Sequence, residues 1–156
     1  MEEFRGELRS KLQHYAETYK QNVSPEQHIA NIRELASSLS TRYADILEGN
    51  LSFGIAAKAL NTYLKSRWCA DGTIQPTHCP FDDRVLKRIR PRKKRGQPST
   101  FRSTWTDATE EHYREWVDLA EKVAGGVPLS EWELKLWQEA VAKERKKVRE
   151  RLKPST

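Results

Sequence analysis

The sequence predicts an all-α protein folded as a single-domain orthogonal bundle of five or six helices. Apolar residues recur every three or four positions along most of the chain, and no segment shows the apolar–polar alternation of a strand. In addition, Ser, Thr and Asp stand where helices should start, and Gly or Pro where they should stop. The length of 156 residues suits one domain, residues 1–156, with a core of its own.

Three helices are expected in the first half of the chain. The first covers residues 3–21, where aromatic and leucine side chains fall on one face. The second starts at Pro25 behind a Ser24 N-cap and runs for about 24 residues to Gly49, a residue suited to a left-handed helix end. The third covers about residues 55–69, after a tight connection.

A loop and a short helix should follow. Gly, Pro and polar residues predict a loop over residues 71–80. Asp82 is placed to cap a short helix, which Pro91 ends. Residues 92–100 contain no apolar side chain to bury, so a basic loop is expected at about residues 90–104.

Two more helices complete the expected bundle. Residues 107–110 form a capping-box pattern that opens the first, and Gly125 ends it. Residues 130–133, Ser-Glu-Trp-Glu, form another capping box that opens the last helix. Large aromatic side chains lie on the apolar stripes of their helices, so we expect most of them in the core and not as stacking platforms for bases. They are Tyr63, Trp68, Trp116, Trp132 and Trp137.

The positive charge is concentrated in one segment. From Arg84 to Arg102 the chain carries nine Lys or Arg and no Asp or Glu; removing these nine from the 28 basic residues leaves 19, against 22 acidic ones. Such a surface gains affinity for nucleic acid by releasing counterions from phosphates, and Phe101 and Trp105 stand at its border for stacking. A second basic run, residues 143–153, is expected to be a frayed helical end. The candidate nucleic-acid-binding residues are Arg84, Lys87, Arg88, Arg90, Arg92, Lys93, Lys94, Arg95 and Arg102.

Several other classes of protein are disfavoured. No apolar run approaches the roughly 18 to 20 residues of a membrane span, and the N-terminus is charged where a secretory signal would be apolar, so a cytoplasmic protein without a membrane partner is expected. Cys69 and Cys79 are expected to be buried, reduced thiols. Zinc ligation by these cysteines and His78 is disfavoured because adjacent His and Cys ligands fit one tetrahedral ion poorly. We therefore expect no metal and no other cofactor.

One motif stands out within residues 47–90. Lys58 is followed seven residues later by Lys65, and then by the segment Pro80-x-Asp82-x-Arg84-Val85. This arrangement resembles the helix-hairpin-helix DNA glycosylases and looks closest to the archaeal type of 8-oxoguanine DNA glycosylase. The resemblance implies that Lys58 is the nucleophile, attacking the sugar C1′ to form a Schiff base, and that Asp82 assists it.

Two functions are therefore considered. The first is a DNA-binding protein that excises a damaged or modified base through Lys58, since a carboxylate held by backbone N–H groups, as at an N-cap, can stabilise positive charge on the sugar. The alternative is a non-enzymatic helical binding module, regulatory or related to phage defence, which uses the same basic face to hold nucleic acid or an acidic protein. In both, nucleic acid is the expected partner, with DNA favoured in the first.

Overall fold

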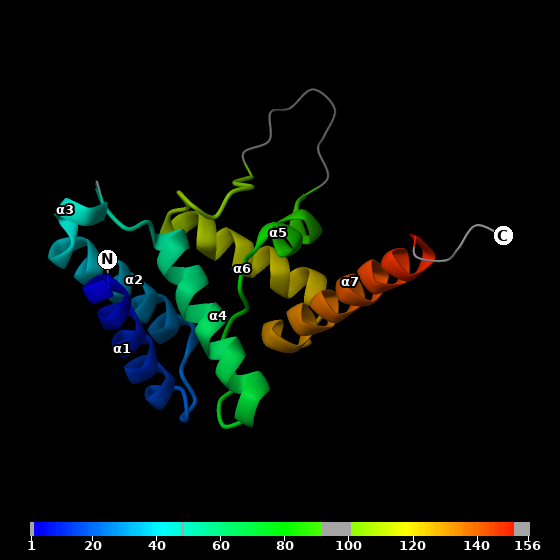
Figure 1. Ribbon diagram of the computed structural model, residues 1–156, viewed down its shortest axis with the longest axis horizontal. Coiled ribbons are helices and arrows are strands. Elements are labelled where there is room, and N and C mark those ends of the chain that lie inside the picture. The colour runs from blue at the N-terminus through cyan, green and yellow to red at the C-terminus, as the bar shows by residue number, and fades with distance from the viewer. Residues whose placement is uncertain (1, 48, 92–100, 152–156) are drawn as a thin grey trace.

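The computed structural model describes residues 2–47, 49–91 and 101–151, and within these ranges every regular element is a helix (Figure 1). The all-α prediction is confirmed. The six expected helices are present, and a four-residue helix, α3, is added to them. The elements are α1 (Glu2–Thr18), α2 (Pro25–Arg42), α3 (Ala44–Leu47), α4 (Phe53–Asp71), α5 (Asp83–Ile89), α6 (Glu110–Ala124) and α7 (Leu129–Arg151).

Helices α1, α2 and α4 pack against one another and form one side of the bundle (Figure 1). The predicted start of α2 is confirmed, because the Ser24 hydroxyl accepts a hydrogen bond from the Gln27 backbone N–H at 3.2 Å, with Pro25 in the first turn. Ile32, on the buried face of α2, is fully excluded from solvent. The apolar stripe read from the sequence is thus the face that makes the core.

The end of α2 differs from the prediction. The helix stops at Arg42, well before Gly49, and Tyr43 adopts a non-helical backbone conformation with φ −122° and ψ 30°. The Tyr43 side chain reaches α1, where its ring lies edge-on to Phe4 and its hydroxyl donates to a Glu7 carboxylate oxygen at 2.9 Å. These contacts between helices outweigh the local helical pattern, and the chain resumes only one short turn as α3.

A close crossing of two segments fixes the start of α4. The helix begins at Phe53, two residues before the predicted position, because the Ser52 hydroxyl caps it by accepting from the Ile55 backbone N–H at 3.1 Å. The chain that leads into α6 runs over this first turn. Gly54 donates to the Ala108 carbonyl at 3.0 Å, and a Cβ atom at Gly54 would lie 1.9 Å from the Trp105 carbonyl oxygen. Only glycine therefore permits this approach.

The starts of α6 and α7 are shifted from the two predicted capping boxes. In α6 the cap is Thr109, paired with His112 and not with Glu110: the Thr109 hydroxyl accepts from the His112 N–H at 3.3 Å, and the Thr109 N–H donates to His112 Nδ1 at 3.1 Å. In α7 the helix already includes Leu129, so Ser130 is not its cap. Burial of the Leu129 side chain favours the earlier start.

The centre of the core is polar. The Tyr113 hydroxyl lies 3.0 Å from His78 Nδ1 and 3.4 Å from His28 Nε2, and it accepts from the Asn61 amide at 3.0 Å. His28 Nδ1 in turn bonds the Tyr19 hydroxyl. Burial disfavours a charged imidazole, so it lowers the pKa of His78 to about 4 and that of His28 well below its usual value. This buried polar cluster ties α2, α4 and α6 to the loop before α5.

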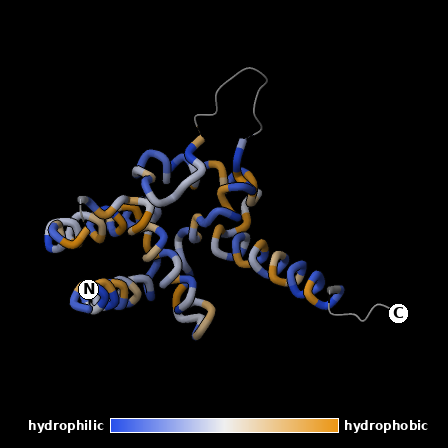
Figure 2. Tube along the Cα trace, turned by 45° about the horizontal axis from the view of Figure 1, so that its top comes forward, coloured by the Kyte–Doolittle hydropathy of each residue, from blue (hydrophilic) through white to orange (hydrophobic). Residues whose placement is uncertain are grey.

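Helix α7 packs against the bundle only along its first half. Leu129 and Glu133 are buried, whereas residues 142–150 are all exposed, and Figure 1 shows the helix leaving the body of the protein. Figure 2 shows hydrophilic and hydrophobic residues alternating along this and the other helices. None of the described helices combines the length and the apolar character needed to cross a membrane.

Candidate functional site

Lys58 and Asp82, far apart in sequence, line the same two surface hollows. Lys58 comes from the second turn of α4, because α4 begins at Phe53. One hollow, of about 530 Å³, lies between α4 and the first half of α7, and we call it the α4–α7 hollow. The other, of about 490 Å³, lies between α4 and α5 and is called the α4–α5 hollow.

The amine of Lys58 rests on an aromatic ring. Its Nζ atom lies 3.6 Å from the centroid of Trp105, and the π face of an indole attracts an ammonium group. Trp105 belongs to the segment that crosses Gly54, so the same close approach that requires glycine also places the ring beside Lys58. Trp105 is half-buried, as the expected border position implied, but Phe101 is buried and offers no stacking surface.

Asp82 performs the predicted capping role. One carboxylate oxygen, Oδ1, accepts from the backbone N–H groups of both Arg84 and Val85 at 3.0 Å. The buried Pro80 and Phe81 precede it and anchor the loop in the core. The carboxylate is thereby fixed where the α4–α7 and α4–α5 hollows meet.

A buried ion pair lines the α4–α7 hollow. Lys65 Nζ lies 2.8 Å and 2.6 Å from the two carboxylate oxygens of Glu133, whose residue is only 3% exposed. Burial raises the pKa of Glu133, and the hydrogen bond from Lys65 acts in the opposite direction. Trp137, one turn further along α7, is 45% exposed, and Lys65 Nζ lies 5.5 Å from its ring centroid. The hollow thus combines a charged pair with an accessible aromatic ring.

Two of these residues were missed as site residues by the sequence analysis. Glu133 was assigned to a capping box, and Trp137 was placed in the core; its exposure shows that the second assignment is wrong. Their spacing of four puts them on one side of α7, as the spacing of seven does for Lys58 and Lys65 on α4, but the sequence does not show that these two sides line one hollow. For the other aromatics the core assignment holds fully at Trp116, while Tyr63, Trp68 and Trp132 are partly buried against the core.

The two cysteines and His78 lie in different surroundings. Cys79 is fully buried, as expected, and burial raises the pKa of its thiol well above the usual value. Cys69 is exposed and lines the α4–α7 hollow, so the prediction of a buried thiol is wrong there. The reason is its place near the end of α4, beyond the part of the helix that packs on the core. His78 lies in the loop before α5, and its side chain is buried in the core.

The basic residues of the segment 84–102 are distributed unevenly. Arg84, Lys87, Arg88 and Arg90 are exposed on α5 and just after it. Arg102 forms an ion pair with Asp107, so its charge is partly compensated. The remaining candidates, Arg92, Lys93, Lys94 and Arg95, lie outside the described residues. We call the exposed basic side of α5, formed by Arg84, Lys87 and Arg88, the α5 face.

Comparisons with protein-family models, with curated proteins and with solved structures found no match. The described residues form a helical protein in which the Lys58 amine and the Asp82 carboxylate line the same two hollows. The α5 face borders these hollows. These hollows offer groups for binding a polyanion and for attack by an amine.

Proposed function

We propose that the protein binds DNA through the α5 face and removes a damaged or modified base, with Lys58 as nucleophile and Asp82 as its partner. The observation that carries the proposal is that both side chains line the same two hollows, directly beside Arg84 and Lys87. The motif resemblance over residues 47–90 assigns these residues the same roles. Exposed basic side chains supply affinity for the phosphate backbone.

The proposed base excision uses the Lys58 amine and the Asp82 carboxylate on the sugar of the target nucleotide. The lone pair of the deprotonated Lys58 amine attacks C1′, while the C1′–N bond breaks and its electrons leave with the base, which takes up a proton. The attached nitrogen loses a proton, and opening of the sugar ring, with protonation of its oxygen, gives a Schiff base. Asp82 stabilises the positive charge that develops on the sugar. Water then hydrolyses the Schiff base and releases Lys58.

The α4–α7 hollow supplies a place for the base. A target base must leave the stack to meet such an amine, and a volume of about 530 Å³ falls within the range of small-molecule sites. The exposed ring of Trp137 offers a stacking surface, and Lys65, whose side chain is 18% exposed, offers a donor for the edge of a base. Each of these side chains already lines the α4–α7 hollow.

Borohydride trapping tests the proposal. The protein, incubated with a duplex that contains 8-oxoguanine and then reduced, should become covalently attached to DNA. Lys58→Gln should abolish trapping, whereas Lys122→Gln, an exposed change on α6, should not. The duplex must carry the base, because any exposed lysine can react with an abasic aldehyde. Undiminished trapping by Lys58→Gln would remove Lys58 from the reaction.

Asp82→Asn provides a second, matched variant. Asn caps helices about as well as Asp, so this change should preserve α5 while removing the negative charge. Slower trapping at unchanged thermal stability is the expected result. An unchanged trapping rate would mean that the carboxylate has no part in the reaction.

One contact favours the non-enzymatic binding module as a second candidate. The Lys58 ammonium lies on the face of Trp105, which stabilises the charged amine that a phosphate would attract. A protein that uses Lys58 in this way would retain DNA in a salt-dependent manner and give no covalent product with borohydride. The trapping experiment therefore separates the two functions.

A further inference from the structure

The exposed half of α7 is a charged helix without a packing partner among the described residues. Residues 143–150 carry five Lys or Arg and two Glu, and every one of them is exposed. The helix nevertheless continues to Arg151. From the sequence this stretch was expected to be a frayed helical end, so the continuous helix differs from the prediction.

One side of this segment continues the α5 face. Lys143, Lys146 and Lys147 share a side of the helix, because residues three and four apart are neighbours on a helix surface. Lys143 lines a hollow of about 300 Å³ together with Arg84, Lys87 and Arg88 of α5. Glu139 also lines this hollow, and Lys146 Nζ lies 4.0 Å from a Glu150 carboxylate oxygen, so part of the positive charge is compensated. Lys147 extends the basic surface away from the bundle.

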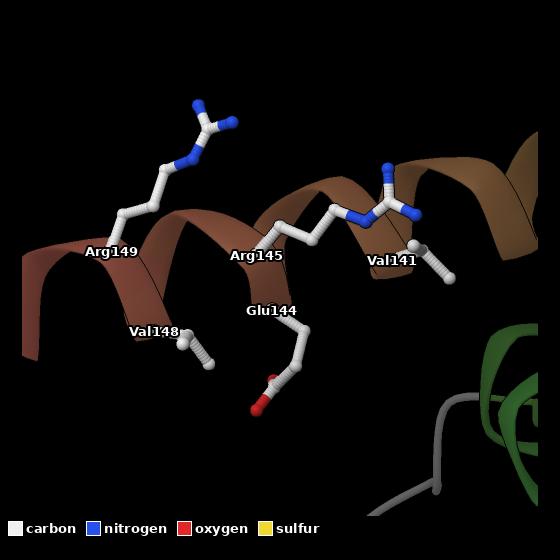
Figure 3. Close-up of a pocket in the computed structure, with 5 residues that line it drawn as sticks. All are labelled: Val141, Glu144, Arg145, Val148 and Arg149. Carbon is white, nitrogen blue, oxygen red and sulfur yellow. The ribbon is translucent and has the colours of Figure 1, made fainter. Parts of the chain in front are cut away.

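The other sides of the segment have a different character. Figure 3 shows Arg145 and Arg149 projecting together on one side, with Glu144 and Val148 on the other. The exposed Val148 and the partly buried Val141 make a poor apolar seam, and a second copy of the segment would bring like charges together. A polyanion complements the segment, whereas a second copy of the chain does not.

We propose that residues 143–150 of α7 form a second DNA-binding element, in which Lys143, Lys146 and Lys147 contact phosphates beside those held by the α5 face. This inference rests on the DNA binding proposed above. Each phosphate that a lysine neutralises contributes about 0.9 to the slope of log Kd against log salt concentration. Three such contacts should therefore steepen the slope by about two to three.

The test measures DNA binding by fluorescence anisotropy on a labelled duplex over a series of NaCl concentrations. The α7 variant replaces Lys143, Lys146 and Lys147 by Gln, a good helix former. The control variant replaces Arg5, Arg9 and Lys11 of α1 by Gln, so both variants lose three positive charges. Helix α1 lies at the other end of the molecule from α7 in Figure 1. Circular dichroism checks that helix content is retained.

The expected result is a slope shallower by about two to three in the α7 variant and nearly unchanged in the α1 control. Equal slopes in the two variants would overturn the inference. A third variant, with Arg84, Lys87 and Arg88 replaced by Gln, keeps the two proposals apart. If it alone lowers the slope, DNA binding by the α5 face stands and the role of α7 fails. If the wild type shows no salt-dependent binding, both fail.

Discussion

Unfolding should take up protons below neutral pH, because the buried polar cluster holds two neutral imidazoles. Burial lowers the pKa of His78 from 6.5 to about 4 and that of His28 in the same direction. Between pH 6.5 and 4 the unfolded chain therefore binds protons at these positions while the folded protein does not. The free energy of unfolding must fall as the pH falls through this range.

The magnitude can be worked out for His78. A pKa difference of one corresponds to about 1.4 kcal/mol, so the free energy of unfolding should be about 2 kcal/mol lower at pH 5 than at pH 7.5 from this residue alone. His28 adds to this loss. Glu133 acts in the opposite direction, because its raised pKa makes the folded state bind a proton at a higher pH than the unfolded state does. The two imidazoles together outweigh this single carboxyl group. Glu26 and Glu110, whose pKa values are lowered, act only below about pH 4.5.

Urea unfolding at several values from pH 7.5 to 5 measures this effect. The free energy of unfolding should fall by at least about 1.4 kcal/mol per pH unit near pH 5, which corresponds to a net uptake of one proton or more. His78→Gln should lower this slope, and so should His28→Gln, even if each variant is less stable at every pH. His14→Gln, at an exposed position, is the control. A wild-type stability that stays constant from pH 7.5 to 5 would refute the reasoning.

Three further predictions concern single contacts, each measured by urea unfolding at pH 7.5. Gly54→Ala should cost about 1 to 3 kcal/mol, because its methyl group would collide with the carbonyl that crosses α4, whereas Gly6→Ala has open space around it. A similar cost in both would contradict the crossing. Glu133→Gln should cost about 3 kcal/mol, because it leaves the largely buried Lys65 ammonium without its carboxylate; a neutral effect would mean that the pair gives no net stability. Asp82→Ala should cost about 1 kcal/mol and Asp82→Asn much less, and equal losses would show that capping is not its contribution.

The parts of the fold that depend on near neighbours could be predicted from the sequence. Ser24 and Asp82 cap their helices as expected, because a cap joins a side chain to an N–H two or three residues away. The all-α class followed from the spacing of apolar residues. Errors arose where a distant contact decided the outcome, as when Tyr43 turned toward α1 and ended α2 early.

The composition of the candidate site could be predicted only in part. Lys58, Asp82 and the basic side chains of α5 were found from their order along the chain. Glu133 and Trp137 come from a helix some 70 residues beyond Lys65, and no pattern in the sequence states which face of that helix meets α4. Trp137 has the spacing of a core residue, yet α7 leaves the bundle at this point and exposes it.

The crossing at Gly54 also couples the position of the Trp105 ring to the backbone at the start of α4. The Ser52 hydroxyl donates to the Thr106 carbonyl at 2.5 Å, and the Gly54 N–H donates to the Ala108 carbonyl. These two hydrogen bonds hold the segment that carries Trp105 against the N-terminus of α4. Moving the backbone of residues 105–108 away from α4 would therefore break these two hydrogen bonds and carry Trp105 away from Lys58.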